Sequence, residues 1–172
     1  MRKSSAVLGS ALFFLAAPGS IAGLMPWWIG KWGFTPEPAW YVSARAAGVL
    51  MIAAGMIFLV ESFARFALEG IGTPAPIAPT KHLVVTGYYR YVRNPMYVAV
   101  LAIILGQALL FANLALAAYA VIVCAAFSAF VMAYEEPALK RQFGDEYVRY
   151  RANVPRWIPR LRPWRAAATP GR

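Results

Sequence analysis

The feature that most constrains this chain is a run of 21 residues without a charged side chain, at 114–134. A helix needs about 20 apolar residues to cross a hydrocarbon core of roughly 30 Å, so this run is long enough to span a membrane. Three further apolar stretches approach the same length, at about 6–29, 40–68 and 95–112. The sequence therefore predicts an all-α integral membrane protein with about four transmembrane helices and a C-terminal helical segment.

The positive charges divide the ends of these spans into two sides. Of the 17 lysines and arginines, 15 fall at the N-terminus, around the loop between the second and third spans, or after the fourth span. Only Lys31 and Arg45 fall on the opposite side. Because positively charged loops stay in the cytoplasm, we expect both termini and the C-terminal helical segment to be cytoplasmic, in an inner or plasma membrane. An alternative interpretation of residues 6–22 as a signal peptide would leave three spans and spoil this asymmetry.

The composition excludes several kinds of site. The chain has one cysteine, one histidine and one aspartate, namely Cys124, His82 and Asp145. A disulfide within the chain, a Cys/His zinc site and a pair of catalytic aspartates are therefore impossible. Only 14% of the residues are charged, against about 25% in a soluble domain. We expect no metal, and we expect one membrane domain over residues 1–166 with a disordered tail at 167–172.

Polar side chains that the apolar pattern does not require gather in two segments, at 80–97 and 135–160. Pro95 opens the third span as a first-turn proline, and Asn94 before it is a candidate N-cap. The amides at such a helix start attract anions. Glu135 and Glu136 stand where the fourth span ends. Because the third and fourth spans form a hairpin, we expect the Asn94–Pro95 corner to lie beside the two glutamates.

Such a site would combine anion-binding amides, two carboxylates and a set of aromatic rings, which come from Tyr88, Tyr89, Tyr91 and Tyr97. A ligand that bears both a carboxylate and positive charge would suit it. Alternatively, the tyrosines and arginines are ordinary interfacial anchors, and the glutamates are solvated or paired with Arg90 or Arg93.

Both segments resemble the membrane methyltransferases related to isoprenylcysteine carboxyl methyltransferase and phospholipid N-methyltransferase. The first carries His82-Leu83-Val84, Gly87-Tyr88-Tyr89 and Arg93-Asn94-Pro95-Met96-Tyr97. The second carries Glu135-Glu136, Leu139, Phe143-Gly144-Asp145-Glu146-Tyr147, Tyr150 and Val154-Pro155. The two motifs stand in the family's order, separated by the expected helical hairpin.

The resemblance implies S-adenosylmethionine as cofactor, in a cytoplasmic pocket closed by the C-terminal segment. The residues that it assigns to the cofactor are His82, Val84, Gly87, Tyr89, Asn94, Pro95, Tyr97, Glu135 and Glu136. It also implies a lipid or other hydrophobic methyl acceptor. Asn94 stands where the prenylcysteine enzymes have histidine, which favours N-methylation of a phospholipid amine. The alternatives are carboxyl O-methylation of a prenylcysteine-like acceptor and a non-catalytic lipid-binding protein with the same fold.

Four residues are candidates for acting on the acceptor. Glu61 and Arg65 are four residues apart, so they share one helix face near the end of the second span. A carboxylate there could orient or deprotonate an amine, and an arginine could hold a lipid phosphate. Alternatively, the two form a helix-end ion pair. Arg93 and Arg156 are the other candidates for holding the acceptor.

The remaining polar and glycine positions have simpler interpretations. Gln107, in the middle of the third span, predicts a helix–helix hydrogen bond, and the Gly48/Gly55 and Gly19/Gly23 spacings predict packing surfaces. The basic and aromatic tail at 156–165 predicts a contact with anionic lipids rather than with nucleic acid.

Overall fold

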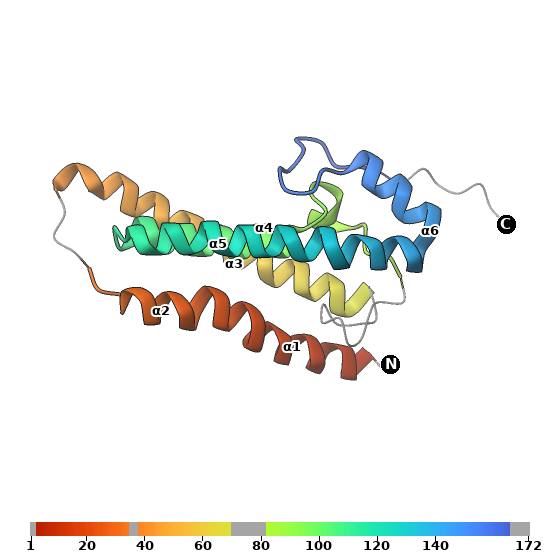
Figure 1. Cartoon of the computed structure of the whole chain (residues 1–172), viewed down its shortest axis with the longest axis horizontal. Coiled ribbons are helices and arrows are strands. Elements are labelled where there is room, and N and C mark those ends of the chain that lie inside the picture. Colours follow the sequence, from red (N-terminus) through yellow and green to blue (C-terminus); the bar gives the residue numbers. More distant parts are fainter. Residues whose placement is uncertain (1–2, 35–37, 70–81, 166–172) are drawn as a thin grey trace.

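The computed structural model describes residues 3–34, 38–69 and 82–165, and the expected disordered tail lies outside these residues (Figure 1). Within them every regular element is helical, as the sequence predicts. The elements in order are α1 (Lys3–Gly19), η1 (Ser20–Leu24), α2 (Met25–Gly30), η2 (Ala39–Tyr41), α3 (Val42–Glu69), η3 (Gly87–Arg90), α4 (Pro95–Leu110), α5 (Leu114–Phe130), η4 (Val131–Glu135) and α6 (Glu136–Asn153). The start of α1 and the junction of α5 with α6 lie at the same end of the bundle (Figure 1).

Among the residues that the structure describes, three helices are long and apolar enough to cross a membrane, namely Ala11–Gly30, Ala39–Arg65 and the helix that begins at Leu114. The predicted integral membrane fold is therefore confirmed. The predicted third span, at 95–112, corresponds to α4. This apolar helix is shorter than predicted, with 16 residues, and it ends at Leu110. Ala112 adopts a left-handed backbone conformation (φ 51°) in the tight turn to α5. The predicted hairpin of α4 and α5 is thus present.

The first helical stretch is continuous through Pro18 and Pro26, and neighbouring helices bond two carbonyls in the turn before Pro26. Proline has no N–H to donate to the carbonyls of the preceding turn. Four residues before Pro26, the Ala22 carbonyl accepts from the Gln107 amide at 2.7 Å. Five residues before it, the Ile21 carbonyl accepts from the Tyr119 hydroxyl at 3.0 Å. These bonds explain how backbone carbonyls freed by proline are satisfied in lipid, and they confirm the predicted role of Gln107.

The contact between α3 and α4 depends on residues without side chains. A Cβ atom at Gly48 would lie 2.6 Å from the Gly106 carbonyl oxygen, and one at Gly55 would lie 2.9 Å from that of Ala99. Nothing larger than glycine fits at either position without moving a helix, so the Gly48/Gly55 packing surface is confirmed. The Gly19/Gly23 surface was wrong: a Cβ atom at Gly23 has nothing within 4 Å.

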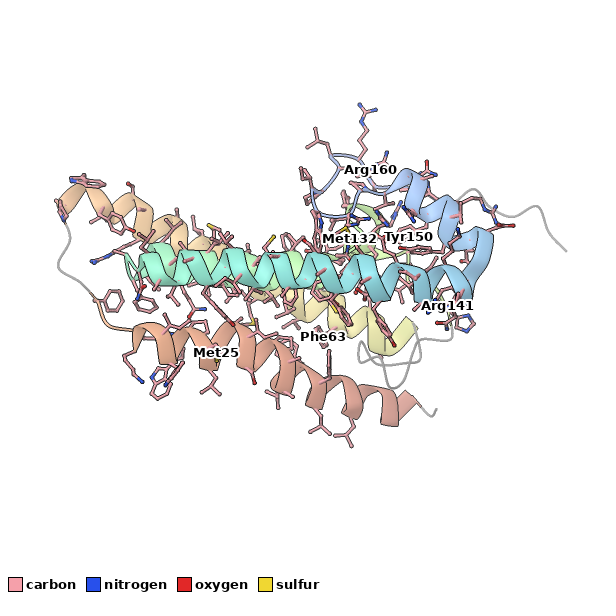
Figure 2. All side chains as sticks on the ribbon, viewed as in Figure 1. Met25, Phe63, Met132, Arg141, Tyr150 and Arg160 are labelled. Atoms are coloured by element: carbon pink, nitrogen blue, oxygen red, sulfur yellow. The ribbon has the colours of Figure 1, made fainter. Side chains whose placement is uncertain are left out.

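Beyond the spans the chain reverses direction and packs residues 154–165 against η3. Gly144 lies inside α6 with φ 51° and ψ −126°, a conformation that glycine adopts with little strain. The helix bends there, and α6 returns toward the bundle (Figure 1). Tyr150 is buried on its inner side, where its hydroxyl donates to the Tyr89 carbonyl at 2.7 Å (Figure 2).

Main-chain hydrogen bonds then hold residues 154–165, which are called the tail from here on, beside η3 and the start of α4. The Arg93 N–H donates to the Pro155 carbonyl at 2.9 Å, the Arg160 N–H to that of Tyr91 at 3.0 Å, and the Trp164 N–H to that of Arg90 at 2.9 Å. The C-terminal segment therefore covers the end of the bundle at which α4 begins.

Candidate functional site

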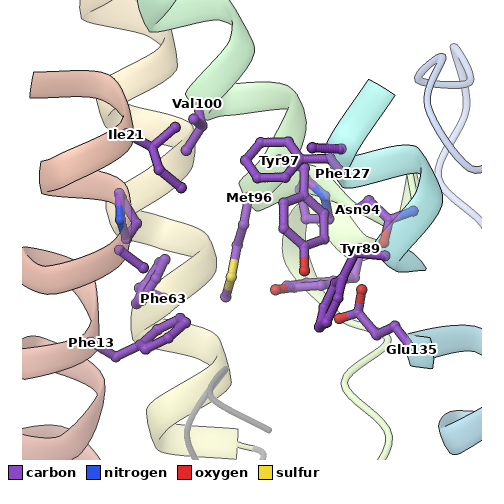
Figure 3. Close-up of a pocket in the computed structure, with 15 residues that line it drawn as sticks. Phe13, Ile21, Phe63, Tyr89, Asn94, Met96, Tyr97, Val100, Phe127 and Glu135 are labelled. Atoms are coloured by element: carbon purple, nitrogen blue, oxygen red, sulfur yellow. The ribbon is translucent and has the colours of Figure 1, made fainter. Parts of the chain in front are cut away.

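A cavity of about 330 Å³ lies where α4 begins, and this volume is within the range of small-molecule sites, about 300–1,000 Å³. Its walls come from α1, η1, α3, η3, α4, α5 and η4. Figure 3 shows Phe13, Ile21 and Phe63 on one side of it. Tyr97 and Glu135 lie on the other side. The cavity is thus apolar toward α1 and α3 and polar toward the end of α5.

The polar side is built around the carboxyl group of Glu135, which follows directly after the apolar run of α5 and η4. The Tyr97 hydroxyl hydrogen-bonds this carboxyl group. The Oε2 atom of Glu135 is buried without a hydrogen-bond partner. Burial raises the pKa of Glu135 to about 7; the hydrogen bond from Tyr97 opposes this rise, and the charge of Glu136 adds to it. A buried acceptor without a donor is costly, so the site suits a ligand that brings one.

Glu136 points into different surroundings. Its side chain is buried, and its carboxylate accepts from Arg156 at 2.7 and 3.0 Å and from Arg93 at 2.9 Å. Arg151 lies 3.7 Å away. Burial by itself raises the pKa of Glu136, but the hydrogen bond from Arg156 and the three positive charges lower it overall. This ion cluster joins the start of α4 to α6 and the tail.

The local helix geometry separates the two glutamates. They meet at the end of η4, a π-helical turn that contains one residue more than an α-helical turn. Consecutive residues on a helix point about 100° apart, and here Glu135 faces the cavity while Glu136 faces the arginines. Such turns occur often at functional sites, and η1 also contributes Ile21 to the cavity wall.

Asn94 occupies the N-cap position of α4, but its side chain does not cap the helix. Instead its amide donates to the Arg156 carbonyl at 3.1 Å. Asn94, Pro95 and Tyr97 all line the cavity, so the predicted meeting of the Asn94–Pro95 corner with Glu135 is present. The amides at the start of α4 receive no bond from this side chain, and they keep the partial positive charge that attracts an anion.

The cavity brings together five of the nine predicted cofactor residues, namely Tyr89, Asn94, Pro95, Tyr97 and Glu135. The other four lie elsewhere. His82 is exposed, Val84 is buried without lining the cavity, and Glu136 is in the ion cluster with the predicted acceptor residues Arg93 and Arg156. Their roles toward a cofactor or an acceptor stay predictions.

The fourth of these residues, Gly87, lies in a second cleft, of about 760 Å³, together with Glu61 and Arg65. The two side chains form an ion pair, and a Cβ atom at Gly87 would collide with both of them. Gly87 also has φ +50°, a conformation that favours glycine. The predicted catalytic role of Glu61 and Arg65 stays a prediction, since neither lines the cavity that holds Glu135.

Sequence reasoning missed the apolar walls of the cavity, which come mainly from Phe13, Ile21, Phe63, Met96, Val100 and Phe127. No signal in the sequence marks them, because an apolar residue of a span has the same pattern whether it faces lipid, core or ligand. Among the residues that the structure describes, no three His, Cys, Asp or Glu side chains gather as a metal site.

Comparison with known proteins adds one match. The family model described as phospholipid methyltransferase matches residues 43–146, more than half of the chain. This range covers α3, α4, α5 and the first part of α6. No curated protein and no solved structure matched the chain significantly.

Proposed function

This chain belongs to the phospholipid methyltransferase family, and we propose that it transfers a methyl group from S-adenosylmethionine to a phospholipid amine at the cytoplasmic membrane interface. Family and fold make it a membrane methyltransferase. The observation that carries the finer proposal is the two-sided cavity, with Glu135 and Tyr97 at one side and apolar walls at the other. One side suits a charged cofactor, and the other suits the apolar part of a lipid.

The donor set on the polar side fits S-adenosylmethionine, which carries an ammonium, a carboxylate, a sulfonium and two ribose hydroxyls. The buried Oε2 of Glu135 would accept from the ammonium or from a ribose hydroxyl. The ring faces of Tyr89 and Tyr97 favour a cation such as the sulfonium. The amides at the start of α4 would attract the carboxylate.

The cofactor supplies an electrophilic methyl group, and the residues of the chain have the task of positioning and of excluding water. Glu135 and Tyr97 would hold the cofactor in one orientation. Phe63, Met96 and Phe127 form apolar walls that would keep water out and guide a lipid amine toward the polar side.

A phospholipid amine is favoured over a carboxyl acceptor for two reasons. The cavity holds a carboxylate, Glu135, which attracts an ammonium group and repels a carboxylate. Asn94 also departs from the histidine of the prenylcysteine pattern. Anionic lipids are proposed as partners of the tail, where Ile158 and Leu161 are 78% and 99% exposed between Arg156, Arg160 and Arg162.

Binding of S-adenosylhomocysteine, measured by calorimetry on the detergent-purified protein, tests the cofactor. We expect Glu135→Ala to weaken binding at least tenfold. Glu146→Ala, which removes the same charge from an exposed position of α6, should bind like the wild type. Equal binding by both variants would remove Glu135 from the site.

The acceptor is tested separately, by transfer of a labelled methyl group to phosphatidylethanolamine in vesicles. A folded protein that binds no S-adenosylhomocysteine and methylates no lipid would be a lipid-binding protein instead. If S-adenosylhomocysteine binds but no methyl group reaches this lipid, the protein is still a methyltransferase. Its acceptor is then not the amine of phosphatidylethanolamine.

A further inference from the structure

The second cleft differs from the cavity in its chemistry, and we infer that it is a separate binding site for the head group of a membrane phospholipid. It lies between the end of α3, η3 and the tail. Among the residues that the structure describes, the arginines that line it are Arg65, Arg90 and Arg165, and the carboxylate is that of Glu61. The assignment requires neither the cofactor nor methyl transfer.

The arginines give the cleft an excess of positive charge. Arg65 is ion-paired with Glu61, so the charges of Arg90 and Arg165 remain uncompensated by this carboxylate. Arg90 is also held in place, because its Nε donates to the Trp164 carbonyl at 2.8 Å. Arginine presents several N–H groups in a planar fork that matches the oxygens of a phosphate. The cleft is thus suited to a phosphate.

Glu61 restricts the head group further. One oxygen of its carboxylate is in the ion pair, and the other, Oε2, is buried without a hydrogen-bond partner. A head group with an N–H or O–H donor would satisfy this oxygen, whereas a trimethylammonium group has no donor to offer. The cleft therefore prefers a primary ammonium group beside the phosphate.

The position of the cleft supports a lipid rather than a soluble phosphate. Tyr88 lines the cleft, and its ring packs at 4.3 Å from that of Phe58 on α3. Phe58 is 41% exposed and lies within the apolar span Ala39–Arg65. The cleft is thus joined through Tyr88 to an exposed aromatic ring on the membrane-spanning part of α3, beside which acyl chains would lie.

The cleft and the cavity are separated by η3. Tyr89 lines the cavity, while its neighbours Tyr88 and Arg90 line the cleft. A 3₁₀ helix has three residues per turn, so consecutive side chains point in three different directions. The two sites therefore share no lining residue among those that the structure describes.

The test measures binding of dihexanoyl phosphatidylethanolamine to the detergent-purified full chain by calorimetry. We expect Arg165→Gln and Arg90→Gln each to weaken binding at least fivefold. Arg162→Gln removes the same charge from an exposed tail position outside the cleft and should bind like the wild type. The cavity is proposed to take the same lipid as acceptor, so only the part of the binding that Arg165→Gln and Arg90→Gln remove is assigned to the cleft.

Two further probes identify the ligand. Dihexanoyl phosphatidylcholine should bind at least fivefold more weakly than the ethanolamine lipid, and Glu61→Gln should abolish that difference. Inorganic phosphate should compete only weakly. Equal loss in Arg162→Gln and Arg165→Gln, wild-type binding in Arg165→Gln, or phosphate binding as tight as that of the lipid would each overturn the assignment. Because Arg90 also bonds the tail, Arg165→Gln decides the result if Arg90→Gln unfolds.

Discussion

Glu135 and Glu136 are consecutive in the chain, but the carboxyl group of Glu135 lies in the cavity beside Tyr97 and that of Glu136 is ion-paired with Arg93 and Arg156. One residue therefore has an oxygen to offer a ligand, and the other joins α4, α6 and the tail. The family resemblance places both residues in one motif, yet the two should respond differently to substitution.

Glu136→Gln should destabilise the fold and leave the residues that line the cavity unchanged. Removing one member of a buried ion cluster leaves the arginines without compensation, at a cost of about 3–5 kcal/mol for a fully buried pair. Arg151 and Arg156 are partly exposed, so we expect the lower end of that range. Thermal unfolding in detergent measures the loss, and Glu146→Gln is the matched control. An unchanged melting temperature would contradict a structural role of the cluster.

The affinity for S-adenosylhomocysteine should rise with pH. The carboxylate form of Glu135 accepts hydrogen bonds from the ligand, and its pKa is raised to about 7. The ionised fraction therefore increases about tenfold from pH 6 to pH 8, and binding should tighten by about the same factor. Calorimetry across this range gives the profile. Glu135→Gln should bind weakly with little pH dependence, and a wild-type profile that falls with pH would contradict this role.

Tyr97→Phe should move the midpoint of that profile to higher pH. The hydrogen bond from the Tyr97 hydroxyl lowers the pKa of Glu135, against the effect of burial. Without it the carboxyl group holds its proton more strongly, so binding at pH 7 should weaken several-fold and recover at higher pH. Tyr134→Phe, at an exposed position outside the cavity, is the control. A uniform loss at every pH would indicate a lost contact instead.

Gly106→Ala should destabilise the contact of α3 with α4. A Cβ atom at Gly106 would lie 2.7 Å from the Gly48 carbonyl oxygen, and such overpacking costs typically about 1–3 kcal/mol. At Gly23 an added Cβ atom has nothing within 4 Å, and Gly23→Ala should instead stabilise its helix slightly. Thermal unfolding of the two variants compares them directly. Equal melting temperatures for Gly106→Ala and Gly23→Ala would contradict a close contact between α3 and α4 at Gly106.

The topology predicts which parts of the chain antibodies can reach. In sealed, right-side-out cells we expect an epitope at the C-terminus to be protected, because loops rich in positive charge stay in the cytoplasm. An epitope inserted between Phe34 and Pro38 should be labelled in the same cells. The reverse pattern would invert the orientation and place the proposed site outside the cell.

Much of the fold could be predicted because a membrane restricts a chain to few structures. Four apolar stretches in a chain with so few charges leave helices as the spanning elements, and the short turn near Asn113 requires a hairpin. That hairpin brings the start of α4 to the end of η4, which is why the meeting of Pro95 with Glu135 followed from sequence alone.

The rest of the site could not be predicted, because it depends on helix rotation. The apolar pattern of α3 does not reveal that Phe63 faces the cavity while Glu61 faces the second cleft. The π-helical turn η4, at the end of which Glu135 and Glu136 meet, cannot be recognised from the amino-acid types at 131–135. The side-chain contacts of Asn94 also depend on the tail, which is distant in sequence.

The tail is joined to the segment around η3 by peptide groups, through the N–H groups of Arg93, Arg160 and Trp164. Every residue except proline carries such a group. The side chains at these positions can therefore be exchanged without removing the bonds that hold the tail. Proline should be rejected at all three positions because it has no N–H to donate. At Arg93 the side chain matters as well, since it is ion-paired with the buried carboxylate of Glu136, whereas the hydrogen bond from Arg160 needs only its peptide group.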